Sequence, residues 1–237
     1  MHNIMKLLEN KWALITGSSR GVGQQIALGL AQRQCNVIVH GRTKQNVAET
    51  LRLLKVYDVQ THVVVGELSS RKGIDAIIAG VKAGPNRVDI LYNNAAIQNE
   101  WKSIWKITPE EWQAVFQVNV FAMIALCNAF APGMKRRGYG RIINLTSGIR
   151  DIPQLAPYSV SKAAVDKYSC DLAAELKGTN VLVNYLDPGW LKTDMGGANA
   201  ENAVETVLPG ALVPALLDDN GPSGRFYAAQ DYRDLER

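Results

Sequence analysis

Tyr158 and Lys162 are the two residues of this sequence best suited to move a proton. They stand four positions apart in a predicted helix, and that spacing places two side chains on one face. A free phenol has a pKa of about 10, which a close ammonium group lowers. We expect Tyr158 to exchange a proton with a substrate oxygen while Lys162 hydrogen-bonds a sugar hydroxyl. An ordinary surface helix can carry the same pair, so the choice depends on the residues around it.

Ser147 ends the predicted strand that precedes this helix. Ligands of open α/β sheets bind beyond the carboxyl ends of the strands. The Ser147 hydroxyl is therefore expected at the ligand edge of the sheet, where it can hold a carbonyl oxygen.

A glycine-rich turn, T-G-S-S-R-G-V-G over residues 16–23, connects a short apolar strand to a helix. Gly17 permits a tight bend, Gly21 lets a diphosphate approach the backbone, and Gly23 lets the helix pack close to the sheet. The free N–H groups and the dipole of the new helix favour an anion there. Such turns also occur without a ligand, but together with the rest of the chain this one predicts dinucleotide binding.

Gly41 and Arg42 occupy the place where an acidic residue usually binds a free ribose 2′-hydroxyl. An arginine with no carboxylate beside it suits a 2′-phosphate instead, and Arg20 in the glycine turn could add a second cation. The sequence thus predicts NADP(H) rather than NAD(H), the alternative being two solvated arginines.

The elements that must position these residues alternate along the chain. Apolar runs and helical spacing predict strands at 12–15, 36–40, 61–65, 89–92, 141–145, 180–186 and 224–228, and helices at 24–33, 47–54, 74–81, 109–135, 158–176 and 201–217. Strands separated by helices imply right-handed crossovers and a parallel sheet. We expect a single α/β domain over residues 1–237, a doubly wound Rossmann fold of about seven parallel strands with helices on both faces.

Composition excludes several other classes of protein. With 47% hydrophobic and 20% charged residues, the 237-residue chain has the make-up of a soluble globule. Its densest cations, residues 135–137 with Arg141, stand where a helix is predicted to end, so no nucleic-acid partner is expected. The odd, widely spaced cysteines form no metal or redox pair, so we expect no metal site, reduced thiols and a cytoplasmic location. No signal-like or membrane-spanning run is apparent, so we expect no membrane partner.

Taken together, these motifs resemble those of the short-chain dehydrogenase/reductase family. The resemblance covers nearly the whole chain and lies in the order and spacing of six motifs. They are Thr16-Gly17-x-x-x-Gly21-x-Gly23, Asn93-Asn94-Ala95-Ala96, Asn119, Ser147, Tyr158-x-x-x-Lys162 and Pro188-Gly189.

The resemblance implies hydride transfer between a nicotinamide and a carbonyl carbon, with Tyr158 as general acid/base. Ser147 would orient the carbonyl, Lys162 would bind the nicotinamide ribose and lower the Tyr158 pKa, and Asn119 would hold a helix irregularity and a relay water. The implied cofactor-binding set is Gly17, Ser19, Arg20, Gly21, Val22, Gly23, Arg42, Glu67, Leu68, Asn93, Ala95, Tyr158, Lys162, Pro188, Gly189, Leu191 and Thr193. Within it, Asn93 and Ala95 would line the adenosine side, and Leu191 and Thr193 would meet the carboxamide.

Departures from the family pattern occur at three places. Glu67 stands where an aspartate is usual, Ala96 replaces a frequent glycine, and the interval from Ser147 to Tyr158 is short. The segment after Pro188 is more similar to that of the carbonyl-reductase-like branch than to the longer lid of ketoacyl reductases. We therefore expect an NADPH-dependent ketone or aldehyde reductase. Two alternatives stay open: a non-catalytic NADP(H)-binding sensor or interaction module, and a 3-oxoacyl thioester reductase.

Aromatic and apolar residues indicate what kind of substrate the protein binds and whether it associates with copies of itself. Trp101, Trp105, Trp112 and Trp190 are expected near the substrate, where they would suit an apolar or aromatic carbonyl compound, although aromatic residues also serve packing. The helices at 109–135 and 158–176 are apolar on more than one side and so need burial on two faces. Family members commonly associate through this pair, and we expect a homodimer or homotetramer.

Overall fold

Seven short apolar stretches form one parallel sheet in the computed structural model, which describes residues 7–235. The sheet order is β3-β2-β1-β4-β5-β6-β7, with every neighbouring pair parallel. The strands are β1 (Trp12–Ile15), β2 (Asn36–Gly41), β3 (Thr61–Val65), β4 (Ile90–Asn93), β5 (Gly140–Leu145), β6 (Val181–Asp187) and β7 (Phe226–Ala228). The predicted doubly wound Rossmann fold is confirmed.

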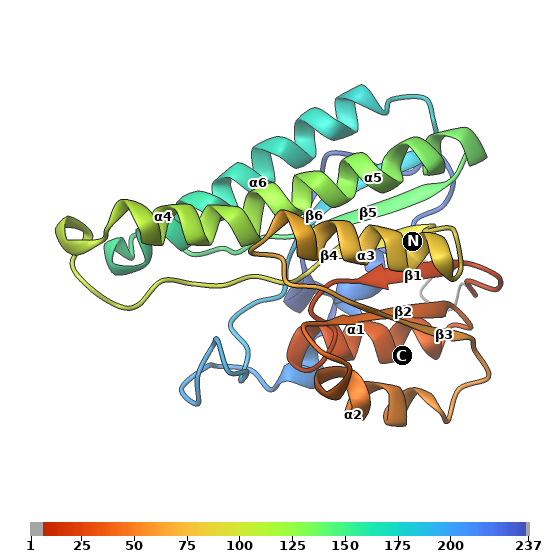
Figure 1. The fold of residues 1–237 in the computed structure, drawn as a ribbon, viewed down its shortest axis with the longest axis horizontal. Helices are drawn as coiled ribbons and strands as arrows, with labels where there is room; N and C mark the ends of the chain where they lie inside the picture. The colour runs from red at the N-terminus through yellow and green to blue at the C-terminus, as the bar shows by residue number, and fades with distance from the viewer. Residues whose placement is uncertain (1–6, 236–237) are drawn as a thin grey trace.

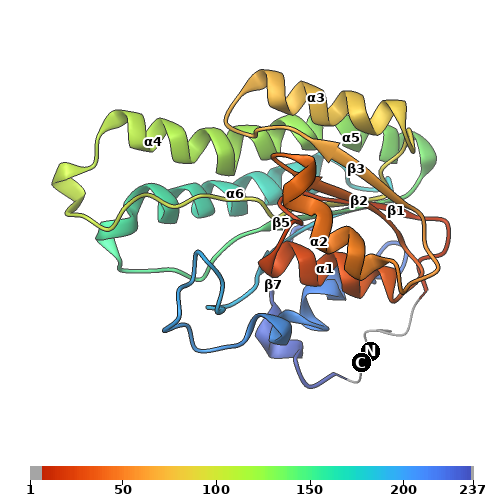
Figure 2. The ribbon, with the colours of Figure 1, turned by 60° about the horizontal axis from the view of Figure 1, so that its bottom comes forward.

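Helices cover both faces of this sheet (Figures 1 and 2). On one face lie α1 (Gly21–Ala31) and α2 (Lys44–Leu54), and on the other lie α3 (Arg71–Ala83), α5 (Ala122–Arg137) and α6 (Ala156–Glu175). β1 serves both cores because successive side chains of a strand point to opposite faces. Ala13 and Ile15 pack with α1, whereas Leu14 packs with α3 and α5.

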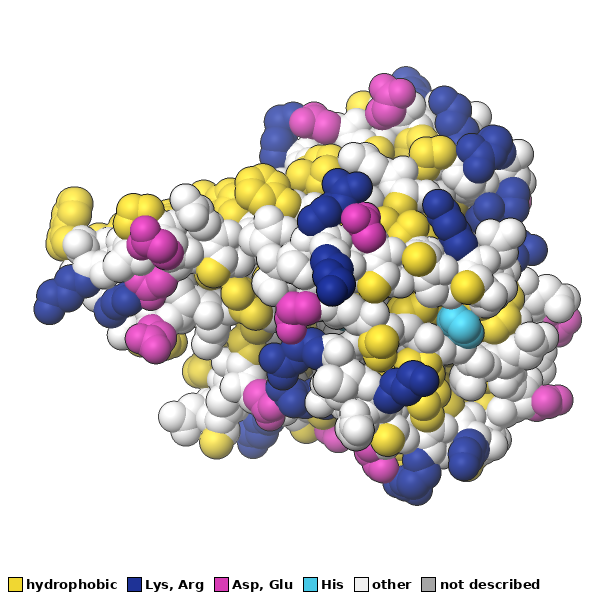
Figure 3. Space-filling view, viewed as in Figure 1, with side chains coloured by type: hydrophobic (Ala, Val, Ile, Leu, Met, Phe, Trp, Pro, Cys, Tyr) yellow, Lys and Arg dark blue, Asp and Glu magenta, His cyan; other side chains and the backbone are white. Residues whose placement is uncertain are grey.

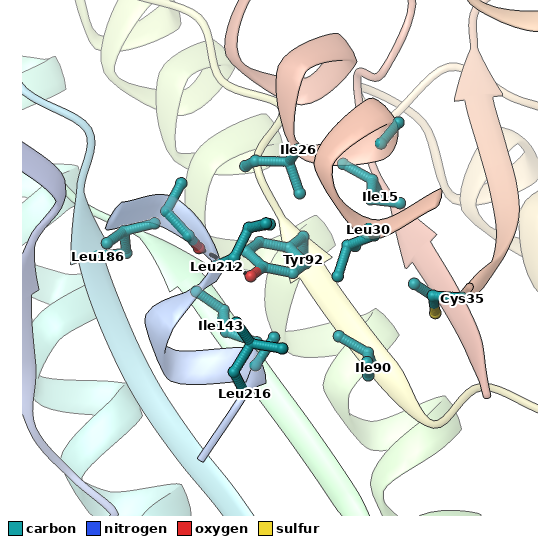
Figure 4. Packing of buried hydrophobic residues seen from close by; sticks show 14 of the residues in the cluster. Ile15, Ile26, Leu30, Cys35, Ile90, Tyr92, Ile143, Leu186, Leu212 and Leu216 are labelled. Carbon is teal, nitrogen blue, oxygen red and sulfur yellow. Dashed lines mark hydrogen bonds between the residues drawn. The ribbon is translucent and has the colours of Figure 1, made fainter. Parts of the chain in front are cut away.

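Tyr92 of β4 lies at the centre of the core on the α1 side (Figure 4). Its ring is fully buried beside Ile26 and Leu30 of α1, and its hydroxyl donates a 2.8 Å hydrogen bond to the Ala211 carbonyl. Burial raises the pKa of this phenol. The hydrogen bond ties the C-terminal segment to the middle of the sheet.

That C-terminal segment differs from the prediction. The single helix expected over residues 201–217 is wrong: the chain forms two short 3₁₀ helices instead, Val204–Val207 and Gly210–Ala215. Pro209 and Pro214 explain the difference, because proline lacks the N–H that an α-helix interior requires and its ring clashes with the preceding turn.

The helix expected over residues 109–135 is interrupted. Thr108 caps the start of α4 (Pro109–Phe116) in a reciprocal capping box with Glu111, and a π-helical turn, Gln117–Phe121, separates α4 from α5. Taken as one helix, Pro109–Arg137 is long and apolar enough to cross a membrane by length and composition. Buried core helices pass the same test, and 56% of its most apolar stretch is buried in the fold.

The predicted basic cluster divides between surface and core. Lys135, Arg136 and Arg137 occupy the last turn of α5, where cations complement the helix dipole. Arg141 is fully buried; it donates to the Leu217 carbonyl and forms an ion pair with Asp219. It therefore stabilises the C-terminal segment and adds nothing to a basic surface.

Candidate active site

The glycine turn between β1 and α1 has the tight geometry that its sequence predicts. Gly17 and Gly21 adopt positive φ angles of 64° and 58°, which favour glycine. A Cβ on Gly23 would lie 2.5 Å from the Gly17 carbonyl oxygen, so only glycine fits there. No side chain caps the start of α1 at Arg20, and its first turn contains no acidic residue. The turn thus fits a diphosphate held by backbone N–H groups.

His40, at the end of β2, holds this turn in place. Its Nδ1 accepts a 2.9 Å hydrogen bond from the Gly17 N–H, so the ring proton lies on Nε2 and is donated to the Gly66 carbonyl at 3.0 Å. Burial lowers the pKa of His40 and favours this neutral ring. The sequence interpretation missed His40, because the contact joins residues 23 positions apart.

Asn94 is a second support that the sequence did not single out by itself. Its Nδ2 donates to the carbonyls of Thr16 and Gly17, at 2.8 and 3.3 Å. The Thr16 hydroxyl in turn accepts from the backbone N–H groups of Asn94 and Ala95. These bonds fix the loop after β4 against the glycine turn and bring Ala95 beside Gly17, within 3.0 Å of a Cβ built there.

Asn93 is placed differently from the expectation. Its side chain is buried and donates to Asn144 Oδ1 and Cys127 Sγ, within the core between β4 and β5. The side chain therefore faces the sheet interior, and only the Asn93 backbone could line the adenosine side.

Arg20 and Arg42 lie on the surface around the glycine turn. Arg20, which we expected to add a second cation, forms a 2.9 Å ion pair with Asp194 in the loop after β6. Arg42 is exposed at the end of β2, directly before Thr43, which caps α2. The first turn of α2 contains no acidic residue. This corner is basic and open, as a 2′-phosphate requires.

The end of β3 and the loop after β6 contribute the rest of the predicted cofactor set. Glu67 is exposed and Leu68 is buried, next to Gly66 at the end of β3. Thr193 lies 3.5 Å from a Cβ built on Gly21, which brings the two loops into contact. Of the other residues in the predicted cofactor set, Ser19 and Val22 lie in the glycine turn, and Pro188, Gly189 and Leu191 follow β6.

Tyr158, Lys162 and Ser147 meet at the carboxyl ends of β5 and β6. The Lys162 ammonium lies 5.5 Å from the centroid of the Tyr158 ring and donates a 2.7 Å hydrogen bond to the Leu145 carbonyl. Burial lowers the Lys162 pKa to about 8. The spacing in α6 therefore brings the predicted pair together beside Ser147.

The direction of the Tyr158 pKa differs from our expectation. Burial raises it, a hydrogen bond with Ser147 lowers it, and the negative charge of Asp187 raises it further. The net pKa lies above the ordinary value, so the predicted lowering by Lys162 does not dominate. Desolvation of the phenol therefore outweighs the hydrogen bond with Ser147.

Asn119 lies within the π-helical turn Gln117–Phe121. Its Oδ1 accepts from the Ile97 N–H, and its Nδ2 donates to the Ile97 carbonyl and to Ser161 Oγ. The expected helix irregularity is therefore present at Asn119. This side chain connects the loop after β4 to α6 one residue before Lys162.

The aromatic residues that we expected near the substrate are dispersed. Trp105 is 91% exposed and Trp101 is 62% exposed, both in the segment that precedes α4, while Trp112 packs against Phe116. Trp190 is half exposed in the loop after β6, where its Nε1 donates to the Gly196 carbonyl. Of the four, Trp190 is closest in sequence to the predicted nicotinamide site.

Comparison with known proteins gives one consistent result. The family model described as short chain dehydrogenase matches residues 11–203. The chain is 37% identical over 194 residues to "Dehydrogenase/reductase SDR family member 4" of Sus scrofa, covering 80% of this chain and 68% of that protein.

Two solved structures share the fold. The 3-oxoacyl (acyl-carrier-protein) reductase of Agrobacterium tumefaciens C58 with NADP bound has a TM-score of 0.84 at 26% identity, covering 96% of this chain and 95% of the other. The 3-oxoacyl-[acyl-carrier protein] reductase of Brucella melitensis with bound NAD has a TM-score of 0.83 at 24% identity, covering 93% and 90%. Sequence motifs, fold and these matches together show that the chain belongs to the short-chain dehydrogenase/reductase family of oxidoreductases, which bind a nicotinamide cofactor and act on small molecules.

Proposed function

We propose that this protein is an NADPH-dependent reductase of ketones or aldehydes in which Tyr158 is the general acid. The observation that carries the proposal is the meeting of Tyr158, Lys162 and Ser147 at the carboxyl ends of the strands, the edge of the sheet that also carries the glycine turn. In this proposal residues 1–237 form one NADP(H)-binding domain.

Each residue has a separate task. When bound, NADPH supplies a hydride to the carbonyl carbon. Ser147 holds the carbonyl oxygen, and Tyr158 donates a proton to that oxygen. The raised Tyr158 pKa keeps the phenol protonated at neutral pH, which suits reduction. Lys162 binds the nicotinamide ribose, and Asn119 positions a relay water beside α6.

The preference for NADPH rests on Arg42. It is exposed at the end of β2, beside a helix start without carboxylates, and its guanidinium can hydrogen-bond a phosphate in bidentate geometry. Arg20 is paired with Asp194 and contributes less. The Agrobacterium tumefaciens reductase with NADP bound supports this choice, whereas the Brucella melitensis protein binds NAD.

Replacing Tyr158 by phenylalanine tests the proposal. Loss of a general acid costs on the order of 10²–10⁴-fold in rate. We expect Tyr158→Phe to lose that much kcat in NADPH oxidation with a panel of diketones, quinones and aromatic aldehydes, while NADPH still binds, as followed by its fluorescence. Undiminished turnover by this variant would exclude the proposed mechanism.

A 3-oxoacyl thioester is the second substrate class, because the Agrobacterium tumefaciens structure with this fold is a 3-oxoacyl (acyl-carrier-protein) reductase. Acetoacetyl thioester turnover above that of simple ketones would favour it. A non-catalytic NADP(H)-binding module is the remaining alternative, and it predicts cofactor binding with no turnover of any carbonyl compound in the panel.

The proposal includes a homo-oligomer that acts in the cytoplasm. Hydrophobic side chains gather on the surface along α4 and α5, at the upper left of the view (Figure 3). Phe121 is 53% exposed between these helices, and Val160 of α6 is 46% exposed. Exposed apolar faces of this kind favour association with a second copy.

A further inference from the structure

Asp187 connects two loops of the active site. It is the last residue of β6, and its Oδ2 accepts a 2.9 Å hydrogen bond from the Gly148 N–H, directly after Ser147. Its Oδ1 accepts from the Gly189 N–H, also at 2.9 Å, in the turn after β6. A Cβ on Gly148 would lie 2.7 Å from Asp187 Oδ2, so a larger residue at this position would displace the carboxylate.

The same carboxylate is connected to the proposed proton-transfer pair through Gly148, which directly follows Ser147, the hydrogen-bond partner of Tyr158. Its charge raises the pKa values of both Tyr158 and Lys162. Asp166, from α6 itself, is the other charged group that acts on Lys162. The loop after β5 presents the neutral side chains of Ser147 and Thr146 on this side. Asp187 is thus the charge that acts on both members of the pair.

We propose that Asp187 is a positioning residue for carbonyl reduction, which joins the Ser147 loop to the Pro188-Gly189 turn and places a negative charge beside Tyr158 and Lys162. This inference rests on the proposed function. A carboxylate at this place favours the protonated form of both groups. The phenol and the ammonium group therefore keep their protons to higher pH than they would without it.

Asp187→Asn removes the charge at nearly constant shape. We expect the alkaline limb of the kcat profile for reduction to move to lower pH by about one unit, because one nearby charge has an effect of that size. We expect kcat to fall as well, while the Kd of NADPH changes less than about threefold. Asp171→Asn is the matched control. It removes an exposed carboxylate of α6 that pairs with Lys167, and it should leave the alkaline limb of the kcat profile unchanged.

A second measurement does not depend on turnover. The tyrosinate absorbance of the NADPH-free protein is titrated for the wild type and for Asp187→Asn, each with and without Tyr158→Phe, so that the difference reports Tyr158 alone. The Tyr158 titration should move to lower pH in Asp187→Asn. Should that variant fail to fold, Asp187→Ser is measured in the same way.

The outcomes separate this inference from the function proposed above. A lower kcat with an unmoved alkaline limb and an unmoved Tyr158 titration would leave Asp187 a purely structural residue and overturn the inference. If the wild type reduces no carbonyl compound, the proposed function fails. The titration of Tyr158 alone then decides whether the Asp187 carboxylate acts on the phenol.

Discussion

Replacing Lys162 by methionine should stabilise the protein, although it removes the side chain that we propose to bind the nicotinamide ribose. The Lys162 side chain is 4% exposed, and its pKa falls from 10.5 to about 8 chiefly because burial disfavours the ammonium. At about 1.4 kcal/mol per unit of pKa, that difference corresponds to about 3 kcal/mol. Methionine keeps the length of the side chain but loses the charged hydrogen bond to the Leu145 carbonyl, at a cost of about 2 kcal/mol. The net gain near pH 7 is therefore about 1 kcal/mol.

The pH dependence gives the sharper test. Below pH 8, Lys162 is protonated in the native and unfolded states, so the native protein carries the full burial cost. Between pH 8 and 10.5 the unfolded state binds more protons than the native state, so the stability of the wild type rises with pH. Lys162→Met lacks this titration. Its advantage should disappear by pH 10.5 and turn into a deficit of about 2 kcal/mol, because the stability of the wild type rises by about 3 kcal/mol over this range.

Urea unfolding of the NADPH-free protein at fixed concentration, followed by tryptophan fluorescence from pH 7 to 10.5, measures this difference. Lys167→Met is the matched control, because Lys167 is exposed on the same helix. Its free energy of unfolding relative to wild type should stay constant between pH 8 and 10.5. A Lys162→Met difference that is the same at pH 7 and pH 10.5 would refute the reasoning that burial of the ammonium destabilises this site.

Three further predictions concern the cofactor, the assembly and the substrate. Arg42→Asp should lower kcat/KM for NADPH by about 10–100-fold, because it removes a charge-assisted hydrogen bond to the 2′-phosphate. The value of kcat/KM for NADH should stay within a few fold of the wild-type value. Equal use of both cofactors by the wild type would contradict the preference for NADPH. Phe121→Asp should shift light scattering from an oligomer to a monomer because it places a charge on an apolar interface, and a monomeric wild type would disprove the assembly. Trp190→Ala should raise KM for aromatic ketones while Trp105→Ala does not, and an unchanged KM would remove Trp190 from substrate contact.

The alternation of strands and helices was predictable from the sequence because the spacing of apolar residues that marks a strand or a helix is a local property of the chain. The strands β2 and β5 are buried along their whole length and carry apolar residues at their centres, and α6 carries Tyr158 and Lys162 at a spacing that fixes their shared face. Once the strands are parallel, their carboxyl ends share one edge, so the glycine turn and Ser147 had to lie on the same side. Family motifs, fold class and the position of the site follow from this local information.

Only the tertiary structure decided which groups are buried and which distant residues touch. His40 holds Gly17, and Arg20 pairs with Asp194, through contacts that no local pattern encodes. The Tyr158 pKa rises because desolvation outweighs the hydrogen bond with Ser147, and desolvation depends on the packing of the whole fold. Arg141 illustrates the same point, since its sequence neighbours suggest a surface cation and its strand position places it in the core.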